Sequence, residues 1–76
     1  MKIQIYGTGC QKCRDLYDNA VAALAESGVA AEVVKVEDIQ QITDAGVFFT
    51  PVIVIDGEVK SSGKLLSIDD IKKIIT

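Results

Sequence analysis

Apolar and polar positions follow two periods along this chain. Residues 2–6, KIQIY, alternate polar and apolar side chains, with Ile3 and Ile5 on one face, and this predicts a strand that Gly7 and Gly9 end. From residue 11 to residue 27 the apolar positions fall three and four apart, which is typical of one helix face, and Gly28 follows where glycine often ends a helix. The side chains predicted to be buried on this helix are Cys13, Leu16, Tyr17, Ala20, Ala23 and Leu24.

The middle of the chain predicts a strand and then a short helix. Residues 31–36 are rich in β-branched side chains, which favour strands. Asp38 is placed to cap a short helix that Gly46 ends. The apolar positions of that helix are Ile39, Ile42 and Ala45.

The last third predicts a hairpin and a closing helix. The run PVIVI at residues 51–55 is apolar throughout, as in a strand buried on both faces. The pair Asp56-Gly57 favours a tight hairpin turn into an edge strand, EVKSS. Ser67 and Asp70 resemble a capping box at the start of a last helix. Its buried stripe would be Ile68, Ile71, Ile74 and Ile75.

The order of these elements predicts the fold class. The chain runs strand, helix, strand, helix, strand, strand, helix over residues 1–76, and we expect a single α/β domain. The first three elements suit a right-handed parallel crossover, and the last two strands an antiparallel hairpin. We therefore expect a four-stranded mixed sheet with three helices.

Composition and charge narrow the classes of partner. The 76 residues are 49% hydrophobic, with a net charge of −3 and no basic run. This disfavours nucleic acid and anionic membranes, which both select clustered Lys and Arg. No apolar run is long enough to span a bilayer, and the N-terminus does not look like a secretory signal. We expect a cytoplasmic monomer whose partners are proteins or small molecules.

The stretch GTGCQKC holds both cysteines and predicts redox chemistry. Cys10 would lie at the N-terminus of the first helix, where free N–H groups and the helix dipole stabilise a thiolate and lower its pKa. Lys12 and Arg14 add positive charge nearby. Cys10 is then the nucleophile, and Cys13, on the inward face, resolves the mixed disulfide formed at Cys10.

Other uses of the pair remain open at this point. A disulfide that closes a loop of only four residues stabilises a fold little, and structural disulfides are uncommon in cytosolic proteins. A structural zinc site needs four ligands, whereas the chain has two thiols and no histidine, so Cu(I) is the more feasible metal. The two cysteines could also be incidental small apolar residues.

At the level of motifs, the chain resembles the thioredoxin/glutaredoxin superfamily, in particular its very small thioredoxin-like members. The resemblance rests on GTGCQKC after the first strand, on GVFFTPVIVIDG from Gly46 to Gly57, and on Gly63 before the last helix. It implies a minimal thioredoxin fold and a thiol–disulfide oxidoreductase that needs no cofactor beyond its redox-active disulfide. It also implies a cis bond before Pro51, contact of Gly9, Thr50 and Pro51 with the substrate, disulfide-containing proteins as substrates, and a reductase or another dithiol protein as electron donor.

The chain departs from that family at positions that affect the reduction potential and the mechanism. Gln11-Lys12 replaces the intervening pairs typical of thioredoxins and glutaredoxins, and Lys12 should favour the thiolate and so make the pair more oxidising. The first strand lacks the acid that thioredoxins use as proton acceptor for the second cysteine. The region SSGKLLSIDD lacks the double glycine of glutaredoxins, which favours a mechanism with both cysteines over one with glutathione.

Two other function classes are alternatives. The copper-carrying heavy-metal-associated domain also places Cys-x-x-Cys after a first strand, but it usually has Met where Thr8 stands and it ends in a strand. A thioredoxin-like adaptor would bind partners without turnover.

Overall fold

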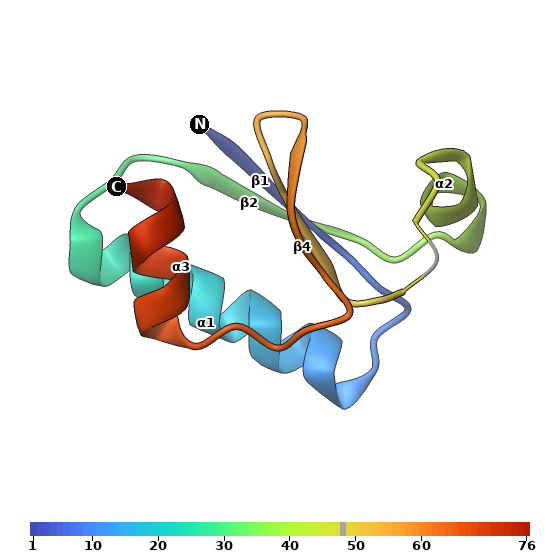
Figure 1. Ribbon diagram of the computed structural model, residues 1–76, viewed down its shortest axis with the longest axis horizontal. Coiled ribbons are helices and arrows are strands. Elements are labelled where there is room, and N and C mark those ends of the chain that lie inside the picture. The colour runs from blue at the N-terminus through green and yellow to red at the C-terminus, as the bar shows by residue number, and fades with distance from the viewer. Residues whose placement is uncertain (48) are drawn as a thin grey trace.

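The sheet of this protein mixes parallel and antiparallel strands, of which the described residues contain four. The computed structural model describes residues 1–47 and 49–76. Within them the strands lie in the order β2-β1-β3-β4 (Figure 1). Their bounds are β1 (Lys2–Tyr6), β2 (Glu32–Val36), β3 (Val52–Ile55) and β4 (Glu58–Ser62). β1 pairs with β2 in parallel, whereas β3 is antiparallel to β1 and β4, so the predicted crossover and hairpin are both confirmed.

Three helices accompany the sheet in the described residues, α1 (Gln11–Ser27), α2 (Ile39–Asp44) and α3 (Ile68–Ile75). Gly28 caps the C-terminus of α1: it adopts the left-handed conformation and donates its N–H to the carbonyl of Leu24. The capping box of α3 is present: the N–H of Asp70 donates to Oγ of Ser67 at 3.1 Å. The element order is the one that the pattern predicts, and this is a minimal thioredoxin fold.

The core lies between the sheet and two helices. α1 and α3 pack side by side on one face, while α2 stands apart at the other end of the molecule (Figure 1). Successive residues of a strand face opposite ways, so Val52 and Val54 lie on the second face, where both are also buried. The buried residues of the core cluster are Ile3, Ile5, Leu16, Ala20, Ala23, Ile53, Ile55, Ile71 and Ile75.

The structure corrects the prediction at three places. Ile39 and Ala45, expected on the apolar face of α2, are both exposed, Ile39 to 69%, because α2 stands at one end of the molecule and buries only Ile42; Ala45 is the C-cap, since the helix ends at Asp44. β2 begins at Glu32 rather than at residue 31. β3 begins at Val52, since Pro51 has no N–H to donate to the ladder.

No helix among the described residues is long and apolar enough to cross a membrane.

Candidate active site

Cys10 occupies the N-cap of α1. The preceding Gly9 has φ 89°, a left-handed backbone that favours glycine and turns the chain from β1 into the helix. Cys10 itself is extended, and its Sγ accepts a hydrogen bond from the N–H of Cys13 at 3.2 Å. The cap of this helix is therefore a sulfur, placed where a helix most favours negative charge.

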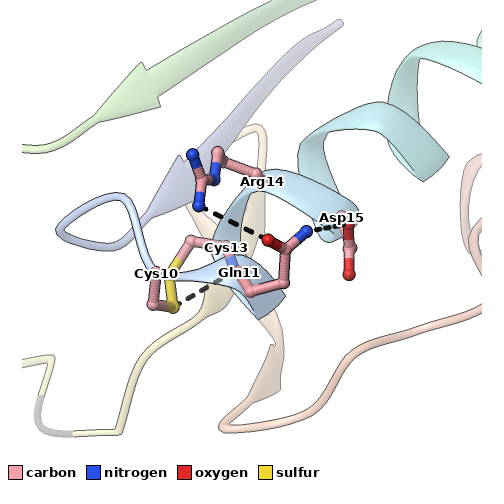
Figure 2. Close-up of a disulfide and its surroundings, with 5 residues drawn as sticks. All are labelled: Cys10, Gln11, Cys13, Arg14 and Asp15. Carbon is pink, nitrogen blue, oxygen red and sulfur yellow. Dashed lines mark hydrogen bonds between the residues drawn. A yellow bond between two sulfur atoms is a disulfide. The ribbon is translucent and has the colours of Figure 1, made fainter.

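The two cysteines differ in exposure. Cys10 is exposed, whereas Cys13 is only 5% exposed and lies among the buried residues of α1. Their sulfurs form a disulfide, with the two Cα atoms 5.1 Å apart (Figure 2). An external disulfide can thus approach Cys10 directly, while Cys13 reaches it from the protein side.

Gly7 makes room for Cys13. Gly7 is buried, and its N–H donates to the carbonyl of Val36 at 3.0 Å, which ties the end of β1 to β2. A Cβ on Gly7 would overlap Sγ of Cys13 and would lie 3.8 Å from Cβ of Thr50. The turn after β1 therefore brings backbone, sulfur and Thr50 to one place, and only glycine allows that approach.

Positive charge near the disulfide is not neutralised within the helix. The first turn of α1 contains no acidic residue, and Lys12 is exposed and in none of the ion pairs of the described residues. Arg14 donates to Oε1 of Gln11 at 3.4 Å, and Gln11 in turn donates to Asp15 at 2.8 Å (Figure 2). Lys12 and Arg14 thus add to the positive helix end that faces Cys10.

The segment around Thr50 and Pro51 lies beside the loop that carries the two cysteines. The Thr50–Pro51 bond is cis, as expected, and Pro51 is buried while Thr50 is exposed. The N–H of Gly63 donates to the carbonyl of Pro51 at 2.9 Å. A Cβ on Gly63 would lie 3.3 Å from Cβ of Phe49, a residue that is 72% exposed. The end of β4 therefore holds the segment of Thr50 and Pro51 in position beside the loop that carries the cysteines.

A small cavity of about 170 Å³ lies beside the buried cysteine. It includes Lys35 and Glu37, which the sequence pattern did not single out as site residues. Oε2 of Glu37 lies 3.5 Å from where a Cβ of Gly9 would stand, so the carboxylate reaches the thiol loop. The lining residues are Ile5, Gly7, Gly9, Cys13, Arg14, Lys35 and Glu37.

Among the described residues, no three His, Cys, Asp or Glu side chains gather as metal ligands would. The described elements run strand, helix, strand, helix, strand, strand, helix, whereas the heavy-metal-associated domain runs strand, helix, strand, strand, helix, strand. The order of elements therefore separates this chain from that alternative.

Comparison with known proteins decides the family. A sequence profile of the thioredoxin domain matches residues 1–76. The chain belongs to the thioredoxin family. It is 46% identical to a thioredoxin of Methanothermobacter thermautotrophicus over 76 residues, which cover 100% of this chain and 99% of the relative. It is 42% identical to a thioredoxin of Methanocaldococcus jannaschii over 71 residues, which cover 93% of this chain and 81% of that relative.

Family membership and the disulfide together define the activity. The pair Cys10-x-x-Cys13 stands in the thioredoxin fold as a closed disulfide. This chain is a thiol–disulfide oxidoreductase that uses a dithiol mechanism, and disulfides are its class of substrate.

Proposed function

We propose that Cys10 is the attacking nucleophile and Cys13 the resolving thiol in the reduction of protein disulfides. The single observation that carries this order is the difference in exposure, since Cys10 is exposed at the helix cap while Cys13 is 5% exposed. In the reduced protein, the helix terminus lowers the pKa of the Cys10 thiol, because its N–H groups and dipole stabilise the thiolate.

The reaction proceeds in two exchanges. The thiolate of Cys10 attacks one sulfur of the substrate disulfide, forms a mixed disulfide and releases the first substrate thiolate. Cys13 then loses its proton and attacks Sγ of Cys10, which releases the second substrate thiolate and closes the Cys10–Cys13 disulfide. Two electrons pass from the dithiol to the substrate.

We propose that the segment of Thr50 and Pro51, beside the thiols, binds the substrate chain. Thr50 is exposed, and its backbone N–H and carbonyl make no hydrogen bond to the residues that the structure describes. They are free to pair with an extended substrate segment, as an added strand does. Gly9 and Pro51 would then flank the substrate sulfur on either side of the Cys10 thiolate.

The physiological setting follows from the chemistry. A dithiol that ends each cycle oxidised needs an electron donor, and we assign this role to a reductase or another dithiol protein. The cytoplasm is the proposed location, since its thiol pools keep such pairs reduced. The disulfide is proposed to be the only redox group, and the working unit a monomer of 8.1 kDa, which size-exclusion chromatography checks.

Trapping tests the order of attack. The reduced Cys13→Ser variant, mixed with insulin as a disulfide substrate, should form a covalent adduct that dithiothreitol releases. The Cys10→Ser variant should form no adduct and should lose insulin reduction. In the trapped adduct, the Thr50 amide should become protected from hydrogen exchange relative to the free variant.

The reverse result would contradict the assignment. If Cys10→Ser formed the adduct and kept its activity while Cys13→Ser did not, the two roles would be exchanged. If Thr50 stayed unprotected in the adduct, strand pairing of the substrate at that position would be wrong. Trapping from a cell extract with Cys13→Ser then identifies the natural substrates.

A further inference from the structure

We infer that Glu37 is the proton acceptor for the buried thiol of Cys13 in the second exchange, acting through water in the adjacent cavity. The inference deepens the proposed function and rests on its assignment of Cys13 as the resolving thiol. It concerns a step that the disulfide alone does not explain, namely where the proton of a buried thiol goes.

The cavity connects the buried sulfur with a carboxylate. Cys13 is 5% exposed, so its thiol has almost no direct contact with bulk water. Both Cys13 and Glu37 line the cavity of about 170 Å³, which has room for a few water molecules. Gly7 and Gly9 also line it: the sulfur of Cys13 occupies the place of a side chain at Gly7, and Oε2 of Glu37 lies 3.5 Å from the place of a Cβ at Gly9.

Glu37 is the one carboxylate among the described residues that line this cavity. It takes part in none of the ion pairs of residues 1–47 and 49–76, so its oxygens are not occupied by a cation. The neighbouring Asp38 is occupied, since it accepts from the N–H of Gln40 at 2.8 Å. β1 contributes Ile5 to the cavity and no acid.

The other charged groups of the cavity are cations. Arg14 faces it from α1 and Lys35 from β2, and Nζ of Lys35 lies 4.4 Å from the centroid of the Tyr17 ring. A positive charge near a thiol favours its thiolate, so both cations assist the second exchange. Glu37 is also exposed, so it can return the proton to solvent after each turnover.

The step balances without a further reactant. The S–H bond of Cys13 breaks, and its proton passes through a water molecule to a carboxylate oxygen of Glu37. The Cys13 sulfur forms a bond to Sγ of Cys10 as the bond from Cys10 to the substrate sulfur breaks. The substrate leaves as a thiolate, which takes a proton from Glu37 or from solvent.

Simple electrostatics predicts the opposite effect of removing this carboxylate. A negative charge near Cys13 disfavours the thiolate, so a field effect alone would make the second exchange faster in Glu37→Gln. A proton acceptor makes it slower. The sign of the change therefore distinguishes the two roles.

The experiment separates the two exchanges in time. Reduced protein in excess is mixed with 5,5′-dithiobis(2-nitrobenzoate) in a stopped-flow instrument, and the coloured thiolate is followed. The wild type should release two equivalents, the second in a phase independent of reagent concentration. Glu37→Gln should slow that second phase about tenfold or more near pH 6 and leave the first unchanged. The difference should vanish above about pH 9, where hydroxide ionises thiols.

Matched variants make each outcome decisive. Glu32→Gln removes an exposed carboxylate from the far end of β2 and should leave both phases at the wild-type rate. Glu37→Asp should restore part of the rate of the second phase. All variants should unfold at the same temperature as the wild type. A second phase in Glu37→Gln that is unchanged or faster, or a slowing of both phases alike, overturns the inference. Cys13→Ser should release one equivalent, and any other yield would count against the proposed function itself.

Discussion

Cys10 and Cys13 are the same amino acid three positions apart, and their surroundings give them different chemistry. Cys10 accepts an N–H at the helix cap and is open to solvent, while Cys13 is packed beneath the turn that follows β1. A thiol at a helix terminus ionises readily, whereas a buried thiol does not. The proposed division into an attacking and a resolving thiol therefore follows from their positions within one helical turn.

At the residue scale, we expect Lys12 to affect the reduction potential of the cysteine pair. A positive charge beside Cys10 should favour its thiolate and so the reduced protein, which would make the disulfide more oxidising. Lys12→Ala should lower the reduction potential by on the order of 10 mV, measured by equilibration with a thiol buffer of known potential. Lys73→Ala, on the last helix, is the control. No change, or a higher potential, would exclude this role for Lys12.

The residues of the site were predictable to different degrees. Cys10, Cys13 and Pro51 stand in motifs, so the sequence points to them directly. Glu37 is 24 positions from Cys13 and lines the same cavity only because β2 pairs in parallel with β1. No short motif carries such a contact. A parallel register drawn from the pattern would have placed the residue after β2 near the loop after β1.

At the scale of elements, α1 begins at the cysteine motif and α3 holds α1 from the side. The link includes a hydrogen bond from the Asn19 side chain to the carbonyl of Leu66 at 2.9 Å and an ion pair between Lys72 and Glu26 at 3.3 Å. The exposed ion pair contributes little to stability, so the apolar contacts between the two helices dominate. The start of α3 thus matters for the support of the active-site helix.

Ser67→Ala should destabilise the protein through α3. The variant loses the side-chain acceptor for the N–H of Asp70, and such caps contribute about 1 kcal/mol to the free energy of unfolding. Urea denaturation of the oxidised protein measures the change. Ser27→Ala is the control, since the buried Ser27 hydroxyl has no hydrogen-bond partner among the described residues. An equal loss in both variants would contradict the capping role.

The periodicity of the sequence predicted helices and strands better than it predicted what each of them packs against. The bounds of α1 and the capping box of α3 follow from local signals, and the structure confirms both. The β-bulge opposite Ile53 and Val54 was not predicted, because the extra residue lies in β4, a mostly exposed strand whose polar sequence shows no alternation that it could interrupt. Ile39 was assigned to a buried face because its spacing from Ile42 is helical, yet burial depends on what the helix packs against.

The whole molecule is stabilised by one main core between the sheet and the pair α1 and α3. Ile71 of α3 is fully buried in it. Ile71→Ala should reduce the free energy of unfolding by about 2–5 kcal/mol, a large part of the total for a small domain. Guanidinium denaturation of the oxidised protein checks this.

Ile39→Ala makes the same substitution at a site that is 69% exposed and should change the stability by about 0.5 kcal/mol or less. A similar loss at both sites would mean that α3 does not pack on the core as described.

Gly7 links the stability of this core to the chemistry of the site. The space that a side chain would fill there is taken by the sulfur of Cys13. Any larger residue would have to displace either the sulfur or the end of β1, and would change the reactivity and the sheet together. Redesign of this protein can therefore vary Gln11 and Lys12 to adjust its chemistry, but position 7 has to be held constant throughout.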